Sequence, residues 1–232
     1  MVTAIMQPYF IPYIGYFQML NAVDQFVIYD NIQFIKSGWM HRNRLLINGK
    51  DEYISLPLRK DSYHLYVDQR YLSDIYAEEK RKILRKIQSY QKAPYFDDVF
   101  PLVSAILDFE DTNLFQFNYH SIKEINRYLD IDTPIIVSST IDIDHDLKGQ
   151  DKVIALCKAL NTTTYINSIG GMELYDKEDF LKQGIKLQFI KTMPSEYQQF
   201  KNNFVPFLSI IDVMMFNDKQ TLKSMLLEYE LV

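Results

Sequence analysis

The 232-residue sequence contains one cysteine, one tryptophan and no long apolar run. A single cysteine excludes a disulfide framework or a thiolate metal cluster within the chain, and Cys157 itself lies in an apolar helical pattern typical of a core residue. No stretch approaches the ~20 apolar residues that span a membrane. The first residues also lack the basic flank and the cleavage site of a signal peptide. The sequence therefore predicts a cytoplasmic protein without membrane insertion.

Positive charge is also scarce, since 25 Lys and Arg stand against 30 Asp and Glu and the net charge is −5. Without a polybasic run, general nucleic-acid binding is not expected. The four histidines are scattered, and none has a second metal ligand at helical spacing. His145 lies among alternating acidic residues, a pattern more typical of a solvated turn than of a metal site. We predict neither a metal nor another cofactor.

Aromatic residues are in excess, with 17 tyrosines and 15 phenylalanines, and several gather near the amino terminus. Residues 4–6 predict a short buried strand that Pro8 and Pro12 end, because proline cannot donate to a ladder and fixes φ. Pro12 suits the first turn of a helix. In open α/β folds ligands bind at such a strand–loop–helix junction; the alternative is an aromatic minicore that anchors the strand. The candidate ligand-binding residues here are Gln7, Tyr9, Tyr13 and Tyr16.

The rest of the chain alternates predicted strands and helices. Strands are expected at residues 25–29, 134–137, 163–166 and 186–190, and helices at 149–160, 177–182, 206–216 and 219–228. Asn48-Gly49 suits the type I′ turn of a β-hairpin over residues 43–58, and a short strand is expected at 65–71. Helices at 74–91, 99–109 and 114–129 form a helical insertion or cap. These features predict an α/β fold: a mostly parallel Rossmann-like sheet with flanking helices, a β-hairpin and the helical insertion.

We expect one compact domain made of three segments. Residues 1–72 form a first α/β segment with the aromatic loop and the hairpin, and residues 73–132 form the helical insertion. Residues 133–232 form a second α/β segment that completes the same sheet.

The segment between the second predicted strand and the hairpin concentrates cations around the sole tryptophan. Gly38 permits a sharp bend, which would bring these cations over Asp30 at the carboxyl end of the second strand. His41 is the histidine whose neighbours suit acid–base chemistry. The candidate binding residues of this segment are Lys36, Trp39, Arg42, Asn43 and Arg44.

Small polar residues follow two later strands of the predicted sheet. They are Ser138 and Ser139 after one strand, and Asn167, Ser168, Gly170 and Gly171 after the next. Because the carboxyl ends of parallel strands share one edge, we expect these residues to cluster with Asp30 and the opening loop. Their hydroxyl and backbone N–H groups suit a phosphate or a carboxylate. The alternative is that they only cap helices.

Asp212 lies in an otherwise apolar predicted helix and needs a partner. Arg42 or Arg44 would supply one; the alternative is that Asp212 caps a neighbouring element or points to solvent. The candidate catalytic residues are therefore His41, Asp30 and Asp212.

The opening loop also invites comparison with the HxGH signature of nucleotidyltransferases, which lies between a first strand and a first helix. Tyr13-Ile-Gly15-Tyr16 occupies that place, and Ser138-Ser139-Thr140 is similar to the SST motif of the same superfamily. Tyrosine cannot supply the imidazolium that stabilises a pentavalent phosphate, so shared topology is expected without shared chemistry. A divergent HxGH-like nucleotide-binding enzyme is one alternative.

Four stretches together resemble the WbqC-like family, and the resemblance covers essentially the whole chain. They are MQPYFIPYIGYF at residues 6–17, IKSGWMHRNR at 35–44, YINSIGG at 165–171 and PFLSIID at 206–212. The family is bacterial, and its members are associated with gene clusters for O-antigen and other surface polysaccharides. The resemblance implies a role in this biosynthesis, and the aromatic and cationic motifs suit a sugar–phosphate ligand. The first hypothesis is therefore a transferase that acts on a nucleotide-linked (amino) sugar, with acyl or aminoacyl transfer as the favoured reaction.

For a sugar-nucleotide ligand, we expect Arg42 and Arg44 to hold phosphates or a carboxylate. Three tyrosines would pack on the sugar or base, namely Tyr9, Tyr13 and Tyr16, and Gln7, Asn167 and Asp30 would orient hydroxyls or the amine. The alternative is a non-catalytic protein that binds sugar nucleotides or assists a partner enzyme. A homo-oligomer is compatible with either function.

Overall fold

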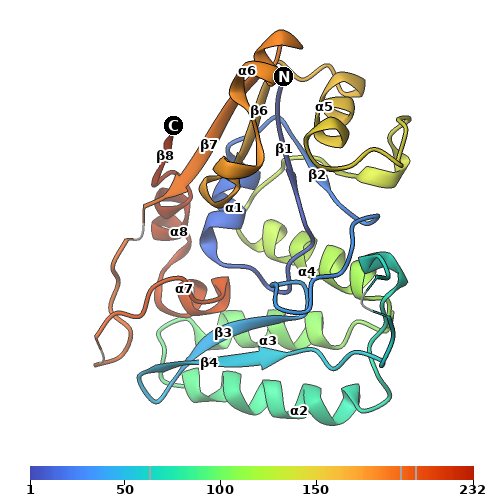
Figure 1. Cartoon of the computed structure of the whole chain (residues 1–232). Helices are drawn as coiled ribbons and strands as arrows, with labels where there is room; N and C mark the ends of the chain where they lie inside the picture. The colour runs from blue at the N-terminus through green and yellow to red at the C-terminus, as the bar shows by residue number, and fades with distance from the viewer. Residues whose placement is uncertain (63, 194, 202) are drawn as a thin grey trace.

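The computed structural model describes residues 1–232 except 63, 194 and 202. Its centre is a six-stranded sheet in the order β5-β2-β1-β6-β7-β8 (Figure 1). Five of these strands are parallel, and β8 runs antiparallel to β7. The strands are β1 (Val2–Met6), β2 (Gln25–Ile28), β5 (Ile135–Val137), β6 (Thr164–Ser168), β7 (Lys186–Thr192) and β8 (Tyr229–Leu231). The predicted α/β class and mostly parallel sheet are confirmed.

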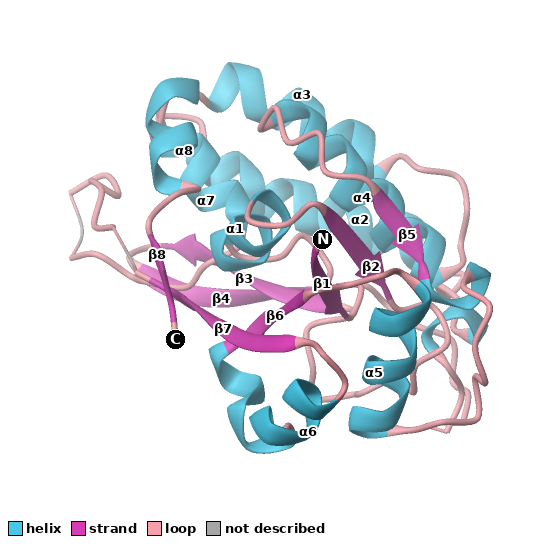
Figure 2. Ribbon diagram, turned by 90° about the horizontal axis from the view of Figure 1, so that it is seen from above, coloured by secondary structure: helices cyan, strands magenta, loops and turns pink. Residues whose placement is uncertain are grey.

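Helices cover both faces of this sheet (Figure 2). One face carries α1 (Ile14–Asn21), α3 (Phe96–Leu107), α4 (Leu114–Tyr128), α7 (Ile210–Phe216) and α8 (Lys219–Met225), whose apolar sides join the larger core. The other face carries α5 (Gly149–Ala159) and α6 (Lys177–Lys182) over a smaller core. Both faces of β2 are covered, so all four of its residues are buried, as expected for a central parallel strand.

The larger core draws residues from all three predicted segments, for example Leu20, Val103 and Met214. The helical segment 73–132 contains α2 (Tyr76–Ile87), α3 and α4. The proposed division into three segments of one domain stays a prediction.

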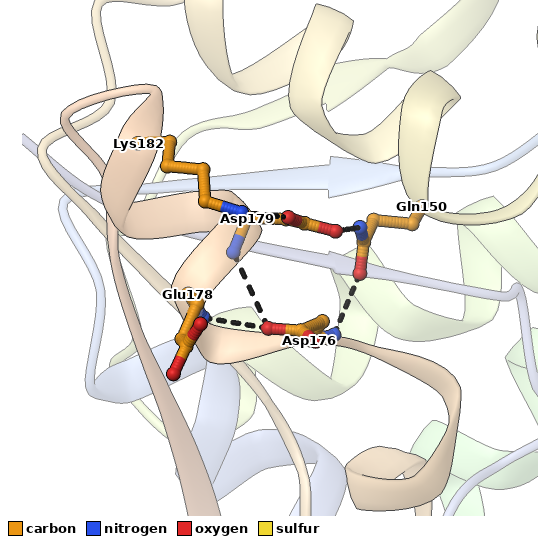
Figure 3. Close-up of polar contacts among 5 residues, drawn as sticks. All are labelled: Gln150, Asp176, Glu178, Asp179 and Lys182. Atoms are coloured by element: carbon orange, nitrogen blue, oxygen red, sulfur yellow. Dashed lines mark hydrogen bonds and ion pairs between the residues drawn. The ribbon is translucent and has the colours of Figure 1, made fainter.

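Helices α5 and α6 are joined by a polar network at the start of α6 (Figure 3). Asp176 caps α6, since its Oδ1 accepts hydrogen bonds from the backbone N–H groups of Glu178 and Asp179. Gln150 of α5 accepts from the N–H of Asp176 at 2.7 Å and donates to the Asp179 carboxylate at 3.2 Å. Lys182 pairs with the other oxygen of Asp179 at 2.9 Å within α6, and the two hydrogen bonds of Gln150 join α5 to the start of α6.

The predicted β-hairpin is β3 (Arg42–Ile47) and β4 (Lys50–Ser55), which lies below the carboxyl ends of the central strands in Figure 1. Its turn residues Asn48 and Gly49 have φ of 52° and 77°. A type I′ turn needs both φ values positive, which explains why Asn-Gly stands there.

Three expected element boundaries are wrong. Residues 65–71 form no strand but a 3₁₀ helix, η1 (Val67–Gln69), flanked by isolated bridges, because no neighbouring strand offers them a continuous ladder. Helix α7 begins only at Ile210, where the Ser209 hydroxyl accepts from the N–H of Ile211. The chain after α8 does not continue as helix to residue 228 but turns into β8 on the edge of the sheet.

Candidate functional site

A cavity of about 520 Å³ opens at the carboxyl edge of the sheet, between β1 and β6. The chain leaves β1 to form β2 on one side, and the later strand β6 pairs on its other side. This is the topological switch point, where open α/β sheets bind ligands. The cavity is lined by Met6, Tyr9, Pro12, Tyr13, Gly15, Tyr16, Met19, Trp39, Asn43, Arg44, Ser168, Ile169, Gly170, Lys191, Thr192 and Phe207.

Two buried amides hold the aromatic loop that forms one wall of the cavity. Asn43 Nδ2 donates to the carbonyls of Phe10 and Ile11 at 3.0 and 2.7 Å. Asn118 Nδ2 donates to the carbonyl of Pro8 at 2.9 Å, on the same loop. These bonds satisfy carbonyl groups that the prolines keep out of any strand ladder. The loop is therefore a fixed wall.

The phenols of Tyr9 and Tyr16 in this wall are neutral hydrogen-bond donors. Burial raises the pKa of Tyr9 to about 12, with a smaller contribution from Tyr13, and burial raises the pKa of Tyr16 well above its usual value. The Tyr16 hydroxyl donates to the Gln7 carbonyl at 3.0 Å. Gln7 thus supports the loop through its backbone, and its side chain is not part of the cavity lining.

Arg44 is the cation of the hairpin that lines the cavity. Its Nη1 pairs with Asp51 at 2.8 Å, its Nη2 donates to the Phe207 carbonyl at 3.3 Å, and its guanidinium lies 5.5 Å from the centre of the Trp39 ring. Arg42 is outside the lining, donates to the carbonyls of Ser37 and Gly38 and lies over Tyr53. Lys36 is also outside the lining.

The cavity carries two cations, Arg44 and Lys191, and among the residues that the structure describes no carboxylate lines it. Its walls are otherwise aromatic, apolar or hydroxyl-bearing. Such a cavity suits an anion with an attached ring system.

The polar strand ends lie on the same edge of the sheet but do not form one site. Ser168 and Gly170, after β6, line the switch-point cavity. Asp30, after β2, instead borders a second, open hollow of about 600 Å³ together with Ser139. Its carboxylate accepts from the hydroxyls of Ser138 and Ser139 and from the N–H of Ser139. The strand order separates these groups, because β1 lies between β2 and β6.

The remaining strand-end residues shape the turn after β6. Asn167 Oδ1 accepts from the backbone N–H of Ser168 at 2.8 Å. A Cβ added at Gly171 would lie 2.6 Å from Asn167 Nδ2, so this close approach requires glycine. Neither residue lines the cavity.

His41 lies away from the cavity, with its ring packed edge-on against Phe34 at 5.4 Å. Burial, followed by the charges of Arg42 and Arg70, lowers the pKa of His41 to about 4. Its Nδ1 is buried and has no hydrogen-bond partner in the described part of the chain. The imidazole is therefore neutral at neutral pH and cannot serve there as a proton donor in the imidazolium form.

Asp212 is fully buried, and the prediction that Arg42 or Arg44 is its partner is wrong. Its carboxylate accepts from the hydroxyls of Tyr90 and Tyr197 at 2.7 and 2.6 Å and from Gln199 Nε2 at 2.7 Å. Burial raises the pKa of Asp212, and the three donors oppose this rise. The arginines are engaged elsewhere: Arg44 pairs with an aspartate of its own hairpin, and Arg42 with backbone carbonyls.

Among the cavity residues that were not named as site residues from the sequence are Lys191, Thr192 and Phe207. The first two directly follow the strand expected at 186–190, so the rule that ligands bind at carboxyl ends of parallel strands would have indicated them. Phe207 stands edge-on to Tyr13 at 6.3 Å, with a positive φ of 57°. No sequence pattern signals this contact.

Neither a membrane-spanning helix nor a metal cluster is among the described features. None of the described helices has the length and apolar character needed to cross a bilayer. In the same part of the chain, no three His, Cys, Asp or Glu side chains gather so that they could hold a metal ion.

The fold and the cavity define an α/β protein with an anion-suited pocket at its switch point. The chain matches the WbqC-like protein family over residues 7–224 and belongs to that family. It is also 27% identical over 217 residues to a Mycobacterium tuberculosis protein described as uncharacterized protein Rv1507c, covering 91% of each chain. No solved structure matches it.

Proposed function

We propose that this protein binds a nucleotide-linked amino sugar in the switch-point cavity and acts on it as an acyl or aminoacyl transferase in bacterial O-antigen or other surface-polysaccharide biosynthesis. The observation that carries the proposal is the lining of the cavity: aromatic walls, two cations and, among the described residues, no carboxylate. A cytoplasmic location is part of the proposal, because nucleotide-linked sugars are cytoplasmic metabolites.

The size and chemistry of the cavity support this ligand class. Small-molecule sites typically measure ~300–1,000 Å³, and a cavity of about 520 Å³ falls within that range. Tyr13, Trp39 and Phe207 offer faces and edges for a base or sugar ring. The cations match a diphosphate, whose charge a carboxylate-lined pocket would repel.

The family supports the pathway but not the reaction. The WbqC-like name, together with the association of such proteins with surface-polysaccharide gene clusters, suggests polysaccharide biosynthesis. In the transfer, the amine of the sugar would attack the carbonyl of an activated acyl or aminoacyl ester or thioester. The C–N bond would form, the C–O or C–S bond would break, and the leaving group would take up the proton of the amine and depart as its alcohol or thiol.

One observation favours a second candidate function, a non-catalytic sugar-nucleotide-binding or accessory protein. None of the three candidate catalytic residues, His41, Asp30 and Asp212, lines the cavity. The HxGH-like alternative has less support, since Tyr13 and Tyr16 stand at the signature positions and the neutral Tyr16 phenol is already bonded to the loop.

The single tryptophan makes the binding proposal directly testable, because Trp39 lies in the cavity wall. We expect its fluorescence to change saturably when UDP-, GDP- or dTDP-linked amino sugars are added. Arg44→Ala removes the side chain that contacts both Trp39 and the Phe207 carbonyl in the cavity wall, and should raise the dissociation constant by about tenfold. Arg59→Ala, which removes a guanidinium that lies over Tyr71 outside the cavity, is the control and should bind as the wild type does.

Mass spectrometry of the bound sugar, incubated with activated acyl and aminoacyl donors, then separates the two candidate functions. A mass increase of the amino sugar that depends on the protein supports transfer. Tight binding without any modified sugar favours the accessory protein. If no sugar nucleotide binds, the proposal is wrong.

A further inference from the structure

The geometry points to Lys191, Ser168 and Thr192 as the subsite for the ligand's anionic group, a phosphate ester, in place of Arg42 and Arg44. This inference rests on the proposed function, and it adds the orientation of the ligand. The phosphates would lie where β6 and β7 end, and the ring systems would lie toward Trp39 and Phe207.

Arg44 already has partners within the protein. Its ion pair with Asp51 at 2.8 Å and its bond to the Phe207 carbonyl use both terminal nitrogens. Its Nε is buried and has no hydrogen-bond partner among the described residues, so a ligand in the cavity does not reach it either. The arginine is therefore better suited to hold the hairpin, Trp39 and Phe207 together than to bind a phosphate.

Lys191 is the less committed cation. Its nearest carboxylate is that of Glu230, at 3.8 Å, and both side chains are about half exposed, at 51% and 55%. At that distance no direct hydrogen bond forms, and an exposed pair of this kind contributes little. A phosphate in the cavity would give the ammonium group a charge-assisted hydrogen bond that Glu230 does not.

Two hydroxyl-bearing residues, Ser168 and Thr192, line the same cavity as Lys191. Ser168 pairs in register with Ile190, so the end of β6 lies next to Lys191 and Thr192 of β7. Ser168 precedes the 3₁₀ helix η4 (Ile169–Leu174) but makes no side-chain cap to it. In the described part of the chain, neither hydroxyl has a hydrogen-bond partner, and both residues line the cavity.

The start of α1 lies next to the Thr192 hydroxyl. A Cβ added at Gly15 would lie 2.3 Å from Thr192 Oγ1, so the first turn of α1 touches the hydroxyl. The residue before α1, Tyr13, provides no side-chain cap, and the N–H groups of this turn add a partial positive charge. The lining of this one cavity therefore holds a cation, two hydroxyls and the start of a helix, and in the described part of the chain no carboxylate.

The test compares nucleoside diphosphates (UDP, GDP and dTDP), their nucleosides and inorganic pyrophosphate as probes, with Trp39 fluorescence and calorimetry as readouts. Lys191→Ala should weaken nucleoside diphosphate binding at least about tenfold and leave nucleoside binding within about twofold. Lys191→Arg should restore most of the loss. Lys186→Ala, an exposed lysine of the same strand outside the cavity lining, is the matched control.

The outcomes separate this inference from the function on which it rests. If the wild type binds nucleoside diphosphates and Lys191→Ala binds them equally well, the anion subsite is wrong but the proposed function stands. The same holds if only Arg44→Ala loses nucleoside diphosphate binding. If no nucleotide binds, the proposed function is wrong. The subsite is then judged on pyrophosphate: binding that depends on Lys191 supports it, and no binding, or binding independent of Lys191, overturns it.

Discussion

Removing the Tyr90 hydroxyl should destabilise this protein strongly, because that oxygen serves two buried groups. It donates to the Asp212 carboxylate at 2.7 Å and accepts from the backbone N–H of Leu46 at 2.6 Å. A hydrogen bond to a charged group contributes ~1.5–3 kcal/mol, and a buried N–H left without a partner costs ~1–3 kcal/mol. The Phe replacement keeps the ring packing against Phe200 and Phe216. We therefore expect Tyr90→Phe to lower the free energy of unfolding by about 4 kcal/mol.

Urea denaturation of three variants tests this ranking. Tyr197→Phe removes one bond to the same carboxylate and should lower the free energy of unfolding by about 2 kcal/mol. Tyr95→Phe, whose hydroxyl has no hydrogen bond in the described chain, should stay within about 0.5 kcal/mol of the wild type. If Tyr90→Phe is no more destabilising than Tyr95→Phe, the cluster of Asp212 with its two tyrosines does not stabilise the fold.

The same carboxylate predicts a pH effect with a defined sign. Burial raises the pKa of Asp212 above its ordinary value of 3.8, so the folded state binds this proton more tightly than the unfolded state does. The contribution of this group to stability is then greatest below pH 3.8 and is lost as the pH rises through the folded-state pKa. Relative to Asp212→Asn, the wild type should gain stability as the pH falls from neutral. A difference that does not change with pH, or that changes the other way, contradicts this assignment.

Three further predictions concern the cavity and its wall. Gly15→Ala should weaken ligand binding severalfold, because the added Cβ would lie 2.4 Å from the ring of Tyr13. Gly170→Ala is the control and should bind normally, since its Cβ meets no atom closer than 4.0 Å. Equal effects of the two substitutions in a fluorescence titration would contradict this geometry. His41 should titrate near pH 4 in an NMR pH series, and a midpoint near 6.5 would show that its ring is not buried as described. Asn43→Ala should lower the free energy of unfolding by about 1–3 kcal/mol in urea, since the buried Phe10 carbonyl loses its donor while the Ile11 carbonyl keeps the Ser209 hydroxyl; a change under about 0.5 kcal/mol would show that the loop is held otherwise.

The α/β fold could be predicted from the sequence because the clearest local patterns lie in the strands and in the turn of the hairpin. The buried run of β2 and the Asn48-Gly49 turn each require one local conformation, and the structure has both. The strand β8 was missed because its three residues are largely exposed and show no alternation. It exists because the edge of β7 supplies a partner, which is a tertiary contact.

The candidate site could be predicted only in part, because some of its contacts are tertiary and follow no local sequence pattern. The loop tyrosines and Ser168 line the cavity because they lie in the loop after β1 and at the end of β6, and Trp39 and Arg44 line it from the segment before the hairpin and from β3. Asp30 also follows a strand but faces another hollow, and only the order of strands in the sheet decides this. The partners of Asp212 come from segments 13 to 122 residues away, beyond any local pattern.

The most direct test of the central claim is a fluorescence titration of the wild-type protein with UDP-, GDP- and dTDP-linked amino sugars. Trp39 is the only tryptophan, and it lies in the wall of the switch-point cavity, so its emission reports on that site alone. We predict a saturable change with at least one of these ligands, which Lys191→Ala weakens. Binding that is detected by calorimetry but leaves the Trp39 emission unchanged, or no binding at all, would contradict the account.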